Sequence, residues 1–197
     1  FEGHAASGRF VFPREDGSIW VTDGSTAGTV ELVAGGGSYA ANPTSEGASV
    51  SFETPNSVVV TDGTQSGTHV HGVGGHANVV ALPGQGFFAS VWEQGKVYLI
   101  SGGALTDLEP NRSVKVNFAP VPVSGGLALA AELDGHGYEV LFTDATVGGM
   151  KVASEIVTGN LSSDPRYLLP PDDTLYFRAQ DASGDEELYA LPYSKLP

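Results

Sequence analysis

One short motif occurs three times along the chain, and its spacing constrains the fold more than any other feature. Thr22–Thr29 reads TDGSTAGT and Thr61–Thr68 reads TDGTQSGT, a step of 39 residues from position 22 to position 61. A degraded copy, Thr143–Met150, begins 82 residues after position 61, which is about two further periods. The eroded stretch Ser101–Gly103 stands where the missing copy belongs. A period of roughly 40 residues with strand-like flanks is typical of a β-propeller or a similar array.

The segments between these turns have the composition of short strands. Many are rich in β-branched and aromatic residues and are bounded by Gly, Asp, Asn or Pro. No stretch of a dozen residues combines helical periodicity with caps. We therefore predict an all-β chain, a five-bladed β-propeller built from four-stranded repeats. It forms a single domain over residues 1–197, with blades at 1–36, 37–75, 76–112, 113–158 and 159–197.

Alignment on the turns gives up to four strands per repeat, which we name A to D from the centre outward. The predicted A strands are Tyr39–Pro43, Asn78–Leu82, Val116–Val121 and Arg166–Leu169, with the N-terminal stretch 1–6 in the first A position. The predicted B strands are Arg9–Arg14, Ser49–Thr54, Phe87–Trp92, Leu127–Glu132 and Thr174–Ala179. The predicted C strands are Ser18–Thr22, Ser57–Thr61, Lys96–Ser101, Tyr138–Thr143 and Glu187–Leu191. The predicted D strands are Thr29–Ala34, Thr68–Val73, Leu105–Glu109 and Met150–Ile156, and only Tyr193–Leu196 is left to supply a fifth.

Charge and cysteine content exclude several classes of function. The chain has 23 acidic and 9 basic residues, a formal net charge of −14, and no cysteine. Without a basic stripe to neutralise phosphates, we expect no nucleic-acid partner and no binding to anionic membranes. No apolar run is long enough to span a bilayer, so we expect no membrane insertion. Disulfides, thiolate metal sites and cysteine nucleophiles are excluded.

The repeat resembles a bacterial family of secreted or cell-surface β-propeller repeat proteins whose unit reads E-L-W-x-T-D-G-T-x-x-G-T. Ile19–Thr29 is the best copy, and Asp134–Asp144 is similar to the longer form D-G-x-H-G-x-E-L-W-x-T-D. Glu187–Tyr189 keeps E-L-Y in place of E-L-W. The resemblance implies export to the surface or medium of a bacterium, usually without an assigned reaction. The chain begins at Phe1 without a leader-like apolar stretch, so we expect any targeting segment to have been removed.

The motif itself is best explained as the turn between strands C and D. Asp can hydrogen-bond the backbone two residues on, and Gly supplies a positive φ without steric cost. Structural roles are therefore predicted for Asp23 and Asp62. Trp20 aligns with apolar positions in the other repeats, which predicts a place in the core between blades. Calcium binding at these turns is the alternative, although the dense acidic spacing of a calcium loop is missing.

Ligand-binding residues are expected on the face opposite these turns, where the B–C and D–A loops lie together. Loops on a rigid scaffold are where binding residues concentrate. Trp92 stands where the other repeats carry mostly polar residues, and an exposed aromatic ring beside carboxylates and amides suits a sugar. The first hypothesis is a non-enzymatic binding module that recognises a glycan or a surface protein. Its candidate ligand-binding residues are Trp92, Asp16, Asp134 and His136.

A second hypothesis is a metal-binding propeller. His69 and His71 alternate on one predicted strand and so point to the same side, and His76 follows closely. Such spacing can present two imidazoles to Zn²⁺ or Cu²⁺, although two exposed histidines on an acidic surface are the simpler explanation. The acidic loop 180–187 could hold Ca²⁺ or be a solvated turn. The candidate metal ligands are His71, His76, Asp181 and Asp185, and the identity of any cofactor stays open.

Enzymatic signals are weak. The chain lacks a G-x-S-x-G elbow, a P-loop, and an H-E-x-x-H motif. A glycosidase would place paired carboxylates at the mouth of the propeller channel, where the candidates are Asp16, Asp134 and Asp181. The remaining alternative is a purely structural repeat that spaces other modules.

Overall fold

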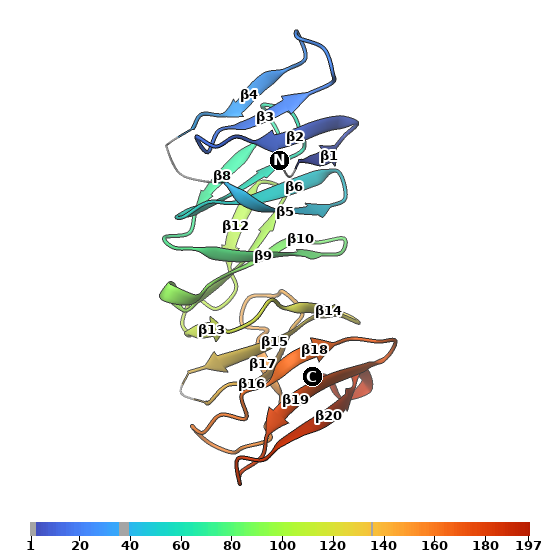
Figure 1. The fold of residues 1–197 in the computed structure, drawn as a ribbon. Helices are drawn as coiled ribbons and strands as arrows, with labels where there is room; N and C mark the ends of the chain where they lie inside the picture. The colour runs from blue at the N-terminus through green and yellow to red at the C-terminus, as the bar shows by residue number, and fades with distance from the viewer. Residues whose placement is uncertain (1–2, 36–39, 135) are drawn as a thin grey trace. The chain divides into compact units, whose positions relative to one another are not determined.

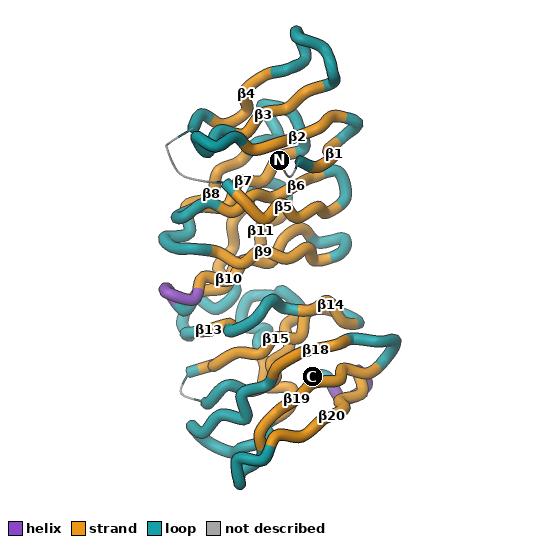
Figure 2. Tube along the Cα trace, in the orientation of Figure 1, coloured by secondary structure: helices purple, strands orange, loops and turns teal. Residues whose placement is uncertain are grey.

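The computed structural model describes residues 3–35, 40–134 and 136–197 of the chain. Its strands form five antiparallel sheets that follow one another in sequence (Figure 1). The only helical segments in these ranges are two short 3₁₀ turns, η1 (Trp92–Gln94) and η2 (Tyr193–Lys195), drawn in purple in Figure 2. The prediction of an all-β chain is therefore confirmed.

The sheets correspond to the predicted repeats, and hydrogen-bonded neighbours are consecutive strands. The first sheet is β1 (His4–Ala6), β2 (Arg9–Pro13), β3 (Ile19–Thr22) and β4 (Val30–Val33). The second is β5 (Ala41–Glu46), β6 (Ser49–Glu53), β7 (Ser57–Thr61) and β8 (His69–Gly72). The third is β9 (Ala77–Leu82), β10 (Gly86–Val91), β11 (Lys96–Ser101) and β12 (Ala104–Asp107).

The last two sheets depart from the four-stranded pattern. The fourth contains β13 (Val114–Val116), β14 (Val121–Val123), β15 (Gly126–Leu133), β16 (Glu139–Thr143) and β17 (Lys151–Ser154), with β13 and β14 both paired to β15. The fifth contains β18 (Arg166–Leu169), β19 (Thr174–Gln180) and β20 (Glu186–Pro192).

Three predicted strand assignments need correction. The predicted strand Val116–Val121 is mostly the interruption between β13 and β14, where Pro120 has no N–H to continue the ladder. Trp92 opens the turn η1 instead of ending a strand. Residues 193–195 form η2, so the fifth sheet has three strands among the residues described. The start of the predicted strand at Tyr39 and the predicted blade boundary at 36/37 lie outside the described residues.

The chain divides into two compact units, Phe1–Val91 with Ile100–Leu105, and Trp92–Leu99 with Thr106–Pro197. In the first unit, apolar side chains of the first and second sheets share one core. Its members include Val11, Ile19, Val21, Val50 and Phe52, all of them inaccessible to solvent. In the second unit, the fourth and fifth sheets pack through Ala128, Val140, Leu175, Phe177 and Ala179. Each core forms because alternate residues of a strand face the same side of the sheet.

Trp20 lies outside the core that the first and second sheets share, and its predicted place in a core between blades stays a prediction. Ile19 and Val21 occupy that core, and Trp20 alternates with them, so it faces the other side of β3 and is half-buried. Its indole N–H donates to Ser18 Oγ at 2.9 Å, and the guanidinium of Arg14 lies 5.4 Å from the ring centroid. Trp20 therefore braces the turn between β2 and β3.

The repeat motif is a turn closed by its own side chains. In the second copy the hydroxyls of Thr61 and Thr68 lie 2.7 Å apart. Asp62 Oδ1 accepts hydrogen bonds from the backbone N (2.8 Å) and the hydroxyl (2.7 Å) of Thr64. Thr64 Oγ1 in turn accepts from Gly67 N at 3.0 Å. The threonine hydroxyl lowers the pKa of Asp62, because its hydrogen bond favours the ionised form.

The other two copies repeat the contacts of the aspartate. Asp23 holds Ser25 through its backbone N and its hydroxyl, and Asp144 holds Thr146 in the same way. A Cβ at Gly28 would overlap the Asp23 carboxylate, just as one at Gly67 would overlap that of Asp62. The second glycine of the motif is thus required by space, and the predicted turn role of both aspartates is confirmed.

Candidate functional site

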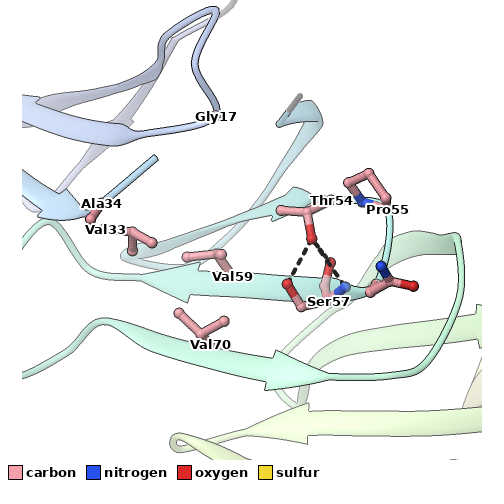
Figure 3. A pocket seen from close by; sticks show the side chains of 9 residues that line it. Gly17, Val33, Ala34, Thr54, Pro55, Ser57, Val59 and Val70 are labelled. Atoms are coloured by element: carbon pink, nitrogen blue, oxygen red, sulfur yellow. Dashed lines mark hydrogen bonds between the residues drawn. The ribbon is translucent and has the colours of Figure 1, made fainter. Parts of the chain in front are cut away.

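A pocket of about 260 Å³ lies in the first unit, at the ends of strands opposite the motif turns (Figure 3). It is bounded by the loop between β6 and β7, by β7 and β8, and by the end of β4. The residues lining it are Gly17, Val33, Ala34, Thr54, Pro55, Asn56, Ser57, Val59 and Val70. The β2–β3 and β6–β7 loops both contribute, and these are loops on the face where a site was predicted.

Local hydrogen bonds fix the polar wall of this pocket. Thr54 Oγ1 lies 2.6 Å from Ser57 Oγ and accepts from Ser57 N at 3.0 Å (Figure 3). The carbonyl of Asn56 accepts from Val73 N at 2.9 Å and Gly74 N at 3.2 Å, which anchors the loop to the end of β8. The Asn56 side chain is exposed. The loop therefore presents two hydroxyls held by hydrogen bonds, beside the exposed amide of Asn56.

The opposite wall of the pocket is apolar. Val33, Val59 and Val70 line it, and Val70 is 56% exposed. No charged side chain is among the residues that form this pocket. An apolar wall facing hydroxyl and amide groups suits a small neutral ligand with both C–H and O–H surface.

Trp92 lies in the second unit and is 52% exposed. Its carbonyl accepts from Gly95 N at 3.1 Å, which closes the turn η1. Gly95 O accepts from Val114 N at 2.9 Å, and the preceding residue, Ser113, donates its backbone N to Asp134 Oδ1 at 2.9 Å. The structure thus ties the loops that carry Trp92 and Asp134 to one connecting segment.

The other two predicted ligand residues have local partners. His136 Nδ1 lies 3.8 Å from Glu155 Oε1, and the histidine side chain is 50% exposed. Asp16 belongs to the first unit, where its Oδ1 accepts from Ser18 Oγ (2.6 Å) and Ser18 N (3.0 Å). These bonds lower the pKa of Asp16. The four predicted ligand residues therefore do not form one cluster within a single unit.

The histidines of β8 are stacked. The rings of His69 and His71 lie 6.2 Å apart at an interplanar angle of 24°, and both side chains are half-buried. His71 Nε2 is buried without a hydrogen-bond partner. Burial lowers the pKa of His71, and the neighbouring His69 lowers it further, so the His71 ring is neutral at pH 7. His76 is exposed in the loop before β9.

The acidic loop satisfies its own carboxylates. Asp181 Oδ1 accepts from Ser183 N (2.8 Å), Ser183 Oγ (2.7 Å) and Asp185 N (3.1 Å). The hydrogen bond from the Ser183 hydroxyl is the main cause of the lowered pKa of Asp181. Across residues 3–35, 40–134 and 136–197, no three His, Asp or Glu side chains gather in a group that could hold a metal ion.

The glycosidase candidates are unsuited to act as proton donors. Asp16 and Asp181 accept several hydrogen bonds in their ionised form, and both have a lowered pKa. A general acid needs the opposite shift, towards a raised pKa. Asp134 accepts the amide of Ser113 and is exposed.

A hollow of about 420 Å³ in the second unit was not predicted. Phe118, Ala119, Arg166, Tyr167 and Leu168 line it. Tyr167 is 66% exposed and Phe118 44%. Sequence reasoning placed both in regular inner strands. Pro120 signals the interruption beside Phe118, whereas no pattern marks the register shift at Tyr167.

Comparison with protein-family models finds no match, and neither does a search of curated proteins. Among the described residues, no helix has the length and apolar character needed to cross a membrane.

Proposed function

We propose that this chain is a secreted or cell-surface, non-enzymatic binding module of the bacterial β-propeller repeat type, with five blades. It recognises a glycan or a surface protein through the loops at one end of its blades. Five consecutive sheets with the period of the repeat support the architecture. The net charge of −14 and the absence of cysteine are compatible with an exported, soluble surface domain.

The observation that carries this proposal is the loop-end pocket of Figure 3. The hydroxyls of Thr54 and Ser57, held by hydrogen bonds, and the exposed Asn56 amide share the pocket with three valines, and no charged side chain lines it. A neutral sugar offers both matching surfaces. Trp92, exposed on a closed turn in the other unit, offers a second contact of the same chemical kind. Two shallow contacts on one chain can act together through avidity.

A glycan array probed in the presence and absence of EDTA tests this proposal. We expect specific hits that survive EDTA. Asn56→Ala removes an exposed amide from the pocket but keeps the backbone carbonyl that anchors the loop, so binding weakens while the fold is kept. Asn78→Ala, at an exposed asparagine of β9 outside the pocket, is the matched control. A blank array, together with no captured surface protein, contradicts the proposal.

A metal-binding role is the second candidate, because His71 Nε2 is buried, unpartnered and adjacent to His69. A transition metal would take the neutral imidazole that burial favours. This candidate predicts that Zn²⁺ or Cu²⁺ raises the melting temperature and that His71→Ala removes the effect. No shift with Zn²⁺, Cu²⁺ or Ca²⁺ rejects it.

A further inference from the structure

The hollow around Tyr167 combines exposed aromatic rings with a strained backbone, and the packing of the fold requires neither. It lies beside the innermost strands of the fourth and fifth sheets, where β15 and β18 are neighbours within the second unit. Phe118 comes from the interruption between β13 and β14, and Tyr167 comes from β18. Two aromatic rings therefore remain largely exposed at one concave place instead of entering the core.

Tyr167 has a backbone conformation that its side chain disfavours. Its φ is +55°, and the register between β18 and β19 shifts between Arg166 and Leu169. A positive φ is a genuine outlier for a bulky aromatic residue. Strain of this kind costs about 1–3 kcal/mol and clusters at ligand-binding sites.

The second sheet provides an internal comparison. Its inner strand β5 has the same kind of irregularity, between Ala41 and Thr44, and Asn42 there has a φ of +50°. Asn42 donates from Nδ2 to Glu53 Oε2 at 2.7 Å on the paired strand. Asparagine tolerates this conformation readily. A residue that suits the bulge thus exists in the same chain, yet the fifth sheet carries tyrosine.

The polar groups beside the rings are ion-paired. Arg178 lies 5.8 Å from the centroid of the Tyr167 ring and pairs with Glu186. Arg166, which lines the hollow, pairs with Asp164. Two arginines and two carboxylates give a formal charge of zero, while each guanidinium keeps further N–H donors. The hollow itself offers two aromatic rings and the Arg166 guanidinium, and the Arg178–Glu186 pair lies beside the Tyr167 ring.

We propose that the hollow lined by Phe118, Arg166 and Tyr167 is a binding site for a neutral pyranose unit of an oligosaccharide. The apolar C–H face of the sugar lies on the Tyr167 and Phe118 rings, whose negative faces attract polarised C–H bonds. Hydroxyl groups of the sugar bond to the remaining N–H groups of Arg166 and to the Arg178–Glu186 pair beside Tyr167. The site deepens the proposed function, on which it rests, by naming the ligand class at a place separate from the Figure 3 pocket and from Trp92.

Charge favours a neutral sugar over an acidic one. The chain has a net charge of −14, which repels a polyanion, and both arginines at the site are already neutralised by carboxylates. The volume of about 420 Å³ falls within the range of about 300–1,000 Å³ usual for small-molecule sites.

Titration of the full chain with cellohexaose, laminarihexaose, xylohexaose and maltohexaose tests this site, with hexagalacturonate as the acidic comparison. Binding is followed by calorimetry and by amide chemical shifts. We expect at least one neutral oligosaccharide to bind and to shift the amides of Phe118 and Tyr167. Tyr167→Asn replaces the ring with the residue that suits a positive φ. We expect it to weaken binding at least tenfold while the melting temperature stays the same or rises.

The matched control is Tyr176→Ala, at a tyrosine of β19 that is 39% exposed and does not line the hollow. We expect its affinity to stay within twofold of wild type. The site is rejected if Tyr167→Asn binds as the wild type does, or if hexagalacturonate is the only ligand. If binding persists in Tyr167→Asn but is lost in Asn56→Ala or Trp92→Ala, this site is rejected while the binding module stands. If no saccharide binds, the site is rejected, and a surface protein is the one ligand class left for the proposed binding module.

Discussion

At the scale of single residues, the repeat motif is a turn closed by its own side chains, and it occurs three times along the chain. Asp62 anchors Thr64, Thr64 anchors Gly67, and the carboxylate occupies the space where a side chain at position 67 would begin. These contacts explain why the same residue types recur in the motif, and the explanation requires no bound ligand.

Gly67→Ala should lower the free energy of unfolding by about 1 kcal/mol, because the new Cβ displaces the Asp62 carboxylate and breaks its bonds to Thr64. Gly72→Ala is the control, since no atom lies within 4 Å of a Cβ built there. Urea denaturation of both variants gives the comparison. If the two variants are equally stable, the turn accommodates a methyl group at position 67, and lack of space does not explain the glycine of the motif.

The same hydrogen bonds predict an acid sensitivity. The pKa of Asp62 in the folded state lies below its ordinary value of 3.8, chiefly through the Thr64 hydroxyl. The unfolded chain therefore binds the proton first as the pH falls, so the stabilisation is complete above pH 3.8 and is lost below it. Asp23 and Asp144 add shifts of the same sign.

Asp62→Asn should flatten the fall of the urea midpoint between pH 5 and pH 2.5, because asparagine has no proton to take up. His69 is the other charged group that acts on Asp62, and its positive charge also lowers the pKa of the aspartate. An unchanged slope in Asp62→Asn would assign the acid sensitivity to other carboxylates.

At the scale of elements, buried carboxylates fasten connections to strands. Glu139 opens β16 with 1% of its surface exposed. Its carboxylate accepts from Ile156 N (3.1 Å), Ser163 N (3.1 Å) and Ser163 Oγ (2.6 Å). The long segment between β17 and β18 is thereby held against the end of the fourth sheet. That segment leads into β18 and Tyr167. Glu139 therefore also holds the stretch of chain that precedes the proposed saccharide site.

Glu139→Ala should lower the stability by about 2 kcal/mol, since it leaves buried donors without an acceptor. Glu132→Ala is the matched control on the neighbouring strand β15. Its carboxylate makes a half-exposed ion pair with Lys115 at 3.4 Å, and such pairs contribute about 0–1 kcal/mol. Thermal and urea denaturation measure both. A loss at Glu132 as large as that at Glu139 would contradict this account of the anchor.

The sequence predicted these elements where local chemistry decides the structure. Asp and Gly specify the turns, and alternating apolar residues specify most strands. The predictions failed where the pairing between strands decides the structure. The alignment drew one strand over Val116–Val121, but β13 and β14 pair separately with β15 and leave residues 117–120 between them. Likewise, the positive φ of Tyr167 arises from a shift in the β18–β19 register, which no pattern around the residue indicates.

At the scale of the whole molecule, the proposed function depends on closure of the five sheets into a ring. Each sheet but the fifth has a fourth strand, and β20 ends the last sheet within the described part of the chain. A free strand edge invites pairing with another strand, so closure of the ring has a clear physical advantage. The proposed propeller and an open array of the same sheets differ in their compactness.

Small-angle scattering at 0.15 M salt, where screening limits repulsion among the excess acidic groups, separates the two arrangements. A compact chain of 197 residues has an expected radius of gyration of about 16 Å. We expect that value, together with one cooperative urea transition, if the five blades form a single ring. A radius above about 20 Å would mean that the two compact units do not close on each other. That result would contradict the proposed binding through several loops of one face, because those loops would not share a face. The Tyr167 site would survive that result, since all the residues that form it lie in the second unit.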